Sequence, residues 1–172
     1  MSCFLPTIYL SKVTDIDQSL LQKYDVKAIL LDIDNTLSPH NAREPFVGVE
    51  KWLNKMRCLN IKLLILSNRS NIQSVSDFAQ KLNLNYVADA KKPFQTGFNK
   101  AVNILGLPCE NVLLVGDQIF TDILGANLFG LKSALVEPQD KNESVFIKIK
   151  RFFEMPFRAA IRYNAGKRNV EK

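Results

Sequence analysis

Hydrophobic and polar positions along the chain alternate between two patterns, short continuous apolar runs and longer stretches with helical spacing. A continuous run predicts a strand that is buried on both faces, as in parallel sheets covered by helices. Such runs fall at 28–31, 61–66, 86–88, 112–115 and 133–136. Helical spacing falls at 17–24, 49–59, 72–82, 94–105 and 121–128, and Gly106 and Gly130 are placed to end the last two helices. This alternation predicts an α/β fold with a three-layer, doubly wound, mostly parallel, Rossmann-like sheet.

Residues 141–172 follow a different pattern, that of a basic amphipathic helix. Its apolar residues recur at helical spacing, and they are Val145, Ile149, Phe152, Phe153, Phe157, Ala160 and Ile161. Pro156 is expected to break this helix, since proline removes a backbone donor from the helix interior. We therefore expect two units, a core at 1–140 and a helical tail at 141–172.

Length and composition place the chain among globular proteins with one substantial core. It has 172 residues, of which 47% are hydrophobic and 23% charged. Cys3, Cys58 and Cys109 are far apart and form no C-x-x-C pair, so neither a disulfide framework nor a zinc site is expected, and a reducing cytoplasm fits best. The first ten residues lack a basic start and contain Pro6, and no apolar run approaches the roughly 20 residues that span a bilayer. We expect neither a signal peptide nor a membrane span.

The net charge of +6 resides entirely in the tail. Residues 141–172 contain nine Lys or Arg against three Glu, and residues 1–140 are neutral overall. A basic, Phe-rich helix suits the surface of an anionic membrane, where each basic residue adds about 1 kcal/mol. Alternatively, the Phe side chains pack on the core and the charges are only solvated. A nucleic-acid partner is not expected, because no nucleic-acid-binding module is visible.

Polar side chains that suit phosphoryl transfer follow four of the predicted strands. They are Asp32 and Asp34 after the first strand, Ser67 after the second, Lys92 after the third, and Asp117 with Asp122 after the fourth. The carboxyl ends of parallel strands share one edge of a sheet, where ligands bind, so we expect these groups to converge there. Crowded carboxylates repel one another, and a divalent cation would relieve that repulsion. A cation and hydrogen-bond donors would surround a phosphate.

These residues occur in motifs that resemble those of the haloacid dehalogenase (HAD) phosphatase superfamily, in the same order. The motifs are Asp32-Ile-Asp34-Asn-Thr36, Ser67-Asn68, Lys92-Pro93 and Gly116-Asp117-x-x-x-x-Asp122. Phe4-Leu-Pro6, Ala90-Lys-Lys-Pro93 and the run from Gly116 to Gly130 extend the resemblance to the YqeG family of class III HAD phosphatases, over about residues 4–137. Relatives of that family in fungi and plants are phosphatidylglycerophosphate phosphatases, which suggests the substrate.

The resemblance implies a Mg²⁺-dependent phosphatase that works through an aspartyl-phosphate. Asp32 would be the nucleophile, and Asp34 would protonate the leaving oxygen and later accept a proton from water. Magnesium would be held by Asp32, Asp117 and the backbone carbonyl of Asp34, with Asp122 binding through water or orienting Asp117. Ser67 and the amide of Asn68 would bind phosphate oxygens. Lys92, preferred over Lys91 because it directly precedes proline, would neutralise phosphate and nucleophile.

The spacing between the motifs leaves no room for a cap domain. About thirty residues separate Asp34 from Ser67, and a loop, one helix and a strand account for them. We therefore expect an open site, which suits a phosphate on a membrane surface or a macromolecule. Two other functions stay open: a phosphatase for a soluble or protein-borne phosphate, and a receiver-like module that accepts phosphate on an Asp after the third strand, here Asp89. His40 is expected on the surface, and Arg69 either reaches an anionic substrate or is exposed.

Overall fold

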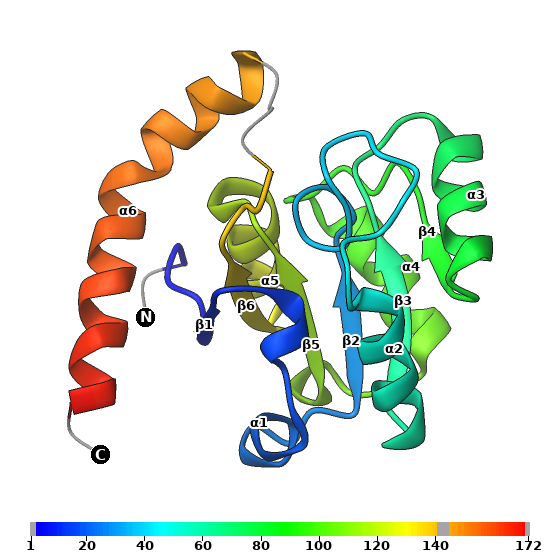
Figure 1. Cartoon of the computed structure of the whole chain (residues 1–172), viewed down its shortest axis with the longest axis horizontal. Helices are drawn as coiled ribbons and strands as arrows, with labels where there is room; N and C mark the ends of the chain where they lie inside the picture. Colours follow the sequence, from blue (N-terminus) through cyan, green and yellow to red (C-terminus); the bar gives the residue numbers. More distant parts are fainter. Residues whose placement is uncertain (1–2, 141–144, 171–172) are drawn as a thin grey trace.

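The computed structural model describes residues 3–140 and 145–170, with side chains for 3–140 and 148–164. Tail residues Lys141, Glu143, Glu171 and Lys172, and the side chains of Val145, Lys167 and Arg168, lie outside the described part. The described chain folds into a six-stranded sheet flanked by helices (Figure 1). Its elements are β1 (Ile8–Leu10), α1 (Gln18–Lys23), β2 (Ala28–Leu31), α2 (Val49–Cys58), β3 (Lys62–Leu66), α3 (Ile72–Lys81), β4 (Asn85–Val87), α4 (Gln95–Leu105), β5 (Val112–Gly116), the π-helical turn η3 (Ile119–Ile123), α5 (Leu124–Phe129), β6 (Lys132–Val136) and α6 (Val145–Val170).

The strand order is β1-β6-β5-β2-β3-β4, and every strand pairing in the described part of the chain is parallel. This confirms the predicted doubly wound α/β fold and the five predicted strands. The sequence pattern missed β1, a three-residue strand that pairs with β6 at the sheet edge. Its residues Ile8-Tyr-Leu10 are too few to establish a pattern.

The sheet separates two hydrophobic layers because the side chains of its strands alternate between faces. Ile29 and Leu31 of β2 point toward α2 and α3, whereas Ala28 and Leu30 point toward α4 and α5. All four residues of β2 are fully buried, which explains why their sequence is apolar without interruption. This central strand is therefore packed on both faces up to its carboxyl end.

The helix α6 runs along the β1 edge of the sheet (Figure 1). Phe157 and Ile161 on its inner face pack with Phe4 and Phe120. The expected break at Pro156 is wrong, since α6 is one continuous helix. Proline removes the N–H that would bond to the carbonyl of Phe152, but both residues are exposed, so water can hydrogen-bond to that carbonyl instead.

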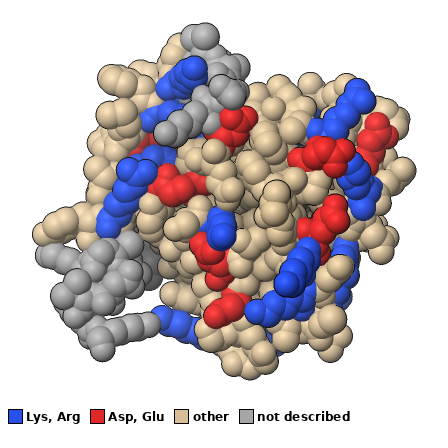
Figure 2. Space-filling model, in the orientation of Figure 1, with Lys and Arg blue, Asp and Glu red and all other residues tan. Residues whose placement is uncertain are grey.

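Among the described residues, no helix combines the length and the apolarity that crossing a membrane requires. On the face seen in Figure 2, the basic side chains of the described residues are interspersed with acidic ones.

Gly97 in α4 contacts the backbone of the segment that leads to Lys92. A Cβ at this position would lie 2.3 Å from the carbonyl oxygen of Ala90 and 2.8 Å from its Cα. Backbone atoms cannot yield as a flexible side chain does, so we expect Gly97→Ala to lower the free energy of unfolding by about 1–3 kcal/mol, although alanine is the better helix former. Urea denaturation measures the change. Thr96→Ala on the exposed face of α4 is the control, expected within about 0.5 kcal/mol of the unmodified protein; equal stability of both variants would contradict the close contact.

Candidate active site

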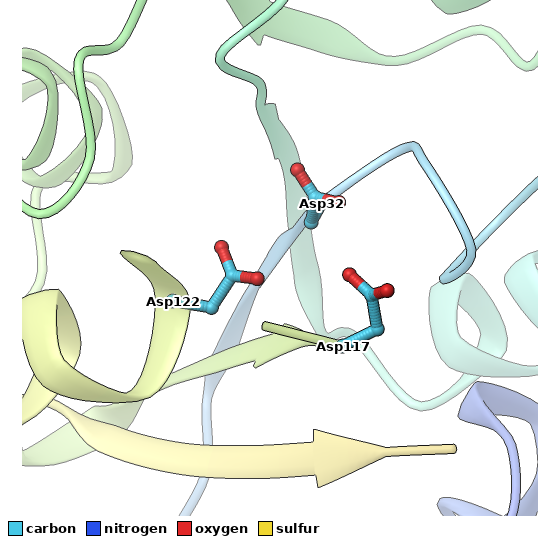
Figure 3. A group of neighbouring side chains, drawn as sticks. All are labelled: Asp32, Asp117 and Asp122. Atoms are coloured by element: carbon cyan, nitrogen blue, oxygen red, sulfur yellow. The ribbon is translucent and has the colours of Figure 1, made fainter. Parts of the chain in front are cut away.

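Three buried carboxylates meet where the central strands end. Asp32 follows β2 and Asp117 follows β5, and these neighbouring strands are in register at Leu31 and Val115. Asp122 comes from η3, and its side chain points toward the other two (Figure 3). One oxygen from each carboxylate lies within 4.8 Å of one from the others. Because the exposed fractions of these residues are only 5%, 1% and 1%, their charges are largely removed from water.

Gly116 allows Asp122 to approach the end of β5. A Cβ at Gly116 would lie 2.4 Å from the carboxyl carbon of Asp122, so any side chain would displace that carboxylate. The N–H of Gln118 also donates to Asp122 Oδ2 at 3.0 Å. Gly116 and the N–H of Gln118 therefore both help to place Asp122 close to Asp117.

The amine of Lys92 lies between two of the carboxylates. Its Nζ is 2.6 Å from Asp32 Oδ1 and 2.7 Å from Asp122 Oδ1, and it donates to the carbonyl of Leu66 at 2.8 Å. Asn68 holds the backbone of this lysine, since Asn68 Oδ1 accepts from the N–H of Lys92 at 2.7 Å and its Nδ2 donates to the Lys92 carbonyl at 3.0 Å. Lys91 points to solvent and pairs with Asp89 at 3.7 Å. The structure thus brings Lys92, not Lys91, to Asp32.

Burial and charge shift the acid–base equilibria of this group. Burial raises the pKa of Asp32 well above its ordinary value, although the charge of Lys92 opposes the shift. Burial also raises the pKa of Asp117 to about 7, against the opposing charge of Arg151. For Lys92, burial would lower the pKa, but the charges of Asp122 and Asp32 outweigh it and raise the pKa. The carboxylates therefore need more positive charge than Lys92 supplies if all are to ionise.

Asp34 lies at the edge of the site and is held by Arg69. Arg69 Nε donates to Asp34 Oδ2 at 3.0 Å and Arg69 Nη2 to Asp34 Oδ1 at 2.7 Å, while the N–H of Asn41 donates at 2.8 Å. Burial would raise the pKa of Asp34, but the hydrogen bonds and charge of Arg69 lower it overall. The side chain of Arg69 is only 8% exposed, so Arg69 is not an exposed residue. His40 is partly buried: its side chain is 19% exposed, and its Nδ1 lies 3.4 Å from Asp34 Oδ1. Nothing in the sequence pattern marked either contact.

A cleft of about 830 Å³ opens above these groups. The predicted site residues that line it are Asp32, Asp34, Asn68, Lys92 and Asp122. Ser67 and Asp117 lie beneath it, each 1% exposed, and Ser67 Oγ accepts the N–H of Arg69 at 3.2 Å. Lys150 of α6 also lines the cleft, a contribution from the tail that the sequence did not indicate. In the described chain, only a loop and α2 lie between β2 and β3, so no cap domain covers the cleft.

The donor set fits a hard divalent cation. Carboxylate and carbonyl oxygens are the ligands that Mg²⁺ prefers, and three carboxylates converge here. Asp117 Oδ1 is buried, and among the described residues it has no hydrogen-bond partner. A buried oxygen of this kind is costly unless a ligand satisfies it.

Comparisons with known proteins agree with this geometry. Residues 1–138 match the family model described as "Mitochondrial PGP phosphatase". The chain is 30% identical over 159 residues to "Probable phosphatase YqeG" of Bacillus subtilis (strain 168), with 92% of each protein covered. Among solved structures, an uncharacterized protein from Listeria monocytogenes serotype 4b superimposes with a TM-score of 0.55 at 20% identity, covering 69% of this chain and 85% of that one. A protein from Streptomyces avermitilis described as a HAD family hydrolase gives 0.51 at 24% identity, covering 64% and 67%.

Proposed function

Because this chain belongs to the family of the mitochondrial PGP phosphatase model and is a phosphatase of the HAD superfamily, we propose that it hydrolyses phosphatidylglycerophosphate in a Mg²⁺-dependent reaction through an aspartyl-phosphate. One observation carries the chemistry: Asp32, Asp117 and Asp122 converge within 4.8 Å of one another, and Lys92 contacts two of them. Magnesium would be held by Asp32, Asp117 and the carbonyl of Asp34, with Asp122 close by. When bound, it would neutralise charge on the nucleophile and the phosphoryl group.

Asp32 is the nucleophile in this proposal. One carboxylate oxygen forms a bond to phosphorus while the bond from phosphorus to the ester oxygen breaks. Lys92, 2.6 Å from Asp32, favours the ionised form of that carboxylate and would also contact a phosphate oxygen. Ser67 and the N–H of Asn68 would donate to the other phosphate oxygens. Water then attacks the aspartyl-phosphate, which releases phosphate and restores Asp32.

Asp34 moves the protons in both steps. It would give a proton to the leaving alcohol and then take one from the attacking water. As seen here, Arg69 stabilises the ionised form of Asp34, which is the form that the second step requires. For the first step, substrate binding would have to loosen the two bonds from Arg69 so that Asp34 can carry a proton.

The outer face of α6 supports a lipid substrate. Ile149, Phe152 and Phe153 expose 52%, 66% and 61% of their surfaces on the side of α6 opposite the core. Lys150, between them in sequence, lines the catalytic cleft. An apolar helix face beside an uncapped cleft would let the enzyme rest on a bilayer and reach a phosphate on a lipid headgroup. The enzyme would then act from the cytoplasm, peripherally on the inner membrane face.

Phosphate release from phosphatidylglycerophosphate in anionic vesicles tests this proposal. We expect Mg²⁺-dependent turnover, and we expect the double variant Phe152→Ala, Phe153→Ala to lose at least about tenfold on vesicles, because burying one such side chain is worth roughly 1.5–3 kcal/mol. Its turnover of soluble p-nitrophenyl phosphate should not change. Ile104→Ala, an equally exposed apolar residue on α4, is the control and should leave both activities unchanged.

Two outcomes would contradict the lipid assignment. Equal vesicle activity of the double variant and the Ile104→Ala control would show that the α6 face does not contact the membrane. Turnover of soluble phosphomonoesters without turnover of the lipid would favour the second candidate, a soluble or protein-borne phosphate, which the polar lining of the cleft by Arg43, Gln73 and Lys81 also suits.

A further inference from the structure

Three charged side chains on the inner face of α6 contact Asp117 and the first turn of η3. Arg151, Glu154 and Arg158, which we call the α6 charge cluster, are three and four residues apart and so share one helix face. The exposed fractions of Glu154 and Arg158 are 1% and 7%. Charges are rarely buried this far unless they are paired and hydrogen-bonded, so the contacts they make require an explanation.

Glu154 fixes the backbone of η3. Its Oε1 accepts the N–H of Ile119 at 2.7 Å and that of Phe120 at 3.3 Å, and its Oε2 accepts from Arg158 Nε at 3.2 Å. These N–H groups belong to the first turn of η3, where backbone donors have no partner within the helix. Glu154 therefore holds in place the turn that carries Asp122.

The two arginines converge on Asp117. Arg151 Nη1 donates to the backbone carbonyl of Asp117 at 2.6 Å, and Arg158 Nη2 donates to the same oxygen. Arg151 Nη2 also donates to Asp117 Oδ2. The other carboxylate oxygen, Oδ1, is buried and has no hydrogen-bond partner among the described residues. Arg151 thus occupies Oδ2 of Asp117 and leaves Oδ1 available to a ligand of the acidic group shown in Figure 3.

We propose that the α6 charge cluster positions Asp117 to bind the divalent cation. In this proposal α6 contributes positioning residues to the active site. This inference rests on the proposed function, because it takes the three carboxylates to be the metal site. The cluster acts through Asp117 and does not touch substrate. Residues that hydrogen-bond to metal ligands commonly change metal affinity or activity 10–100-fold when removed. One helix would then present its outer face to the membrane and its inner face to a metal ligand.

The contact between Arg151 and Asp117 could also have the opposite effect on metal affinity. A guanidinium on a metal-binding carboxylate could compete with the cation, in which case removing Arg151 would tighten metal binding. Positioning predicts weaker binding after the same change. The direction of the change in metal affinity therefore distinguishes positioning from competition.

Calorimetric titration of the full-length protein with MgCl₂ is the test, since it measures binding without turnover. We expect Arg151→Gln to raise the dissociation constant for Mg²⁺ by about 10–100-fold, and Arg151→Lys, which keeps one charged donor, to recover part of the loss. Met155→Ala, on the same helix but 59% exposed, is the control and should bind Mg²⁺ within about twofold of the unmodified protein. Helical circular dichroism must match among the variants.

A second variant tests the proposal even if the Arg151→Gln protein fails to fold. It changes Arg158, which bonds to the backbone carbonyl of Asp117. Arg158→Lys keeps a cation beside Glu154 but shortens its reach to the Asp117 carbonyl, and we expect a severalfold weaker affinity for Mg²⁺. Unchanged or tighter binding in both the Arg151→Gln and Arg158→Lys proteins would overturn the proposal. If the unmodified protein itself bound no Mg²⁺, the proposed metal-dependent function would fail instead, so the two failures are distinguishable.

Discussion

Replacing Asp32 by asparagine is expected to lower kcat for p-nitrophenyl phosphate by a factor on the order of 10³ or more, because the amide cannot attack phosphorus. The change removes one of three crowded carboxylates, keeps the shape of the side chain and leaves Lys92 paired with Asp122, so the fold should persist. Acid-quenched protein incubated with substrate should contain an acyl-phosphate that hydroxylamine cleaves, and the Asp32→Asn protein should contain none.

Asp89→Asn is the matched control for that result. Asp89 is exposed, and its φ of 45° is a conformation that asparagine also adopts. It is also the residue on which a receiver-like module would take phosphate. Near-normal turnover in Asp89→Asn, together with loss in Asp32→Asn, is expected; the reverse pattern would move the phosphorylated residue to Asp89 and contradict the proposed mechanism.

Lys92→Met should damage both activity and stability. The substitution leaves the buried carboxylates of Asp32 and Asp122 without the amine that lies 2.6 and 2.7 Å from them. Breaking a buried ion pair by removing one partner costs about 3–5 kcal/mol, so we expect a loss of that size in the free energy of unfolding at pH 7 in the absence of Mg²⁺. Phosphate release should fall to background, since the positive charge beside the nucleophile is gone.

Lys91→Met is the control that shows whether the losses in Lys92→Met depend on the position of the lysine or only on its charge. Lys91 carries the same charge one residue earlier, but 67% of its side chain is exposed. We expect a change in unfolding free energy of no more than about 0.5 kcal/mol and normal turnover. Guanidinium chloride denaturation and the phosphate-release assay, applied to both variants, measure the difference. Similar losses of stability and turnover in the two variants would contradict a specific role for Lys92 in the site.

The sequence predicted the central part of the fold because that part is buried on both sides. The four residues of β2 have no solvent-exposed face, so their apolar run has no polar interruption, and the acids that follow it stand out. The edge strand β1 was missed because it has only three residues, of which Ile8 alone is buried, so no pattern is established. Helix α5 was predicted from 121, but Asp122 lies in the preceding π-helical turn, where it faces the other carboxylates instead of capping a helix.

The contacts made by arginines could not be predicted in the same way. In sequence, Arg151 and Arg158 look like the solvated charges of an amphipathic helix, because a charged residue shows the same helical spacing whether water or a carboxylate surrounds it. Their burial depends on how α6 packs against η3, which is a long-range property. The ion pair between Arg69 and Asp34 could not be predicted for the same reason, since these residues are 35 positions apart and meet only through long-range packing.

The pairing of β1 with β6 has a consequence for how the protein is made. Thr7 and Ser133, which flank this pairing and bond to each other, are 126 positions apart. Because translation adds about 5–20 residues per second, β6 is synthesised about 6–25 s after β1. The pairing of β1 with β6 can therefore begin only after residues 132–136 have been synthesised, and the docking of α6 beside it only after that.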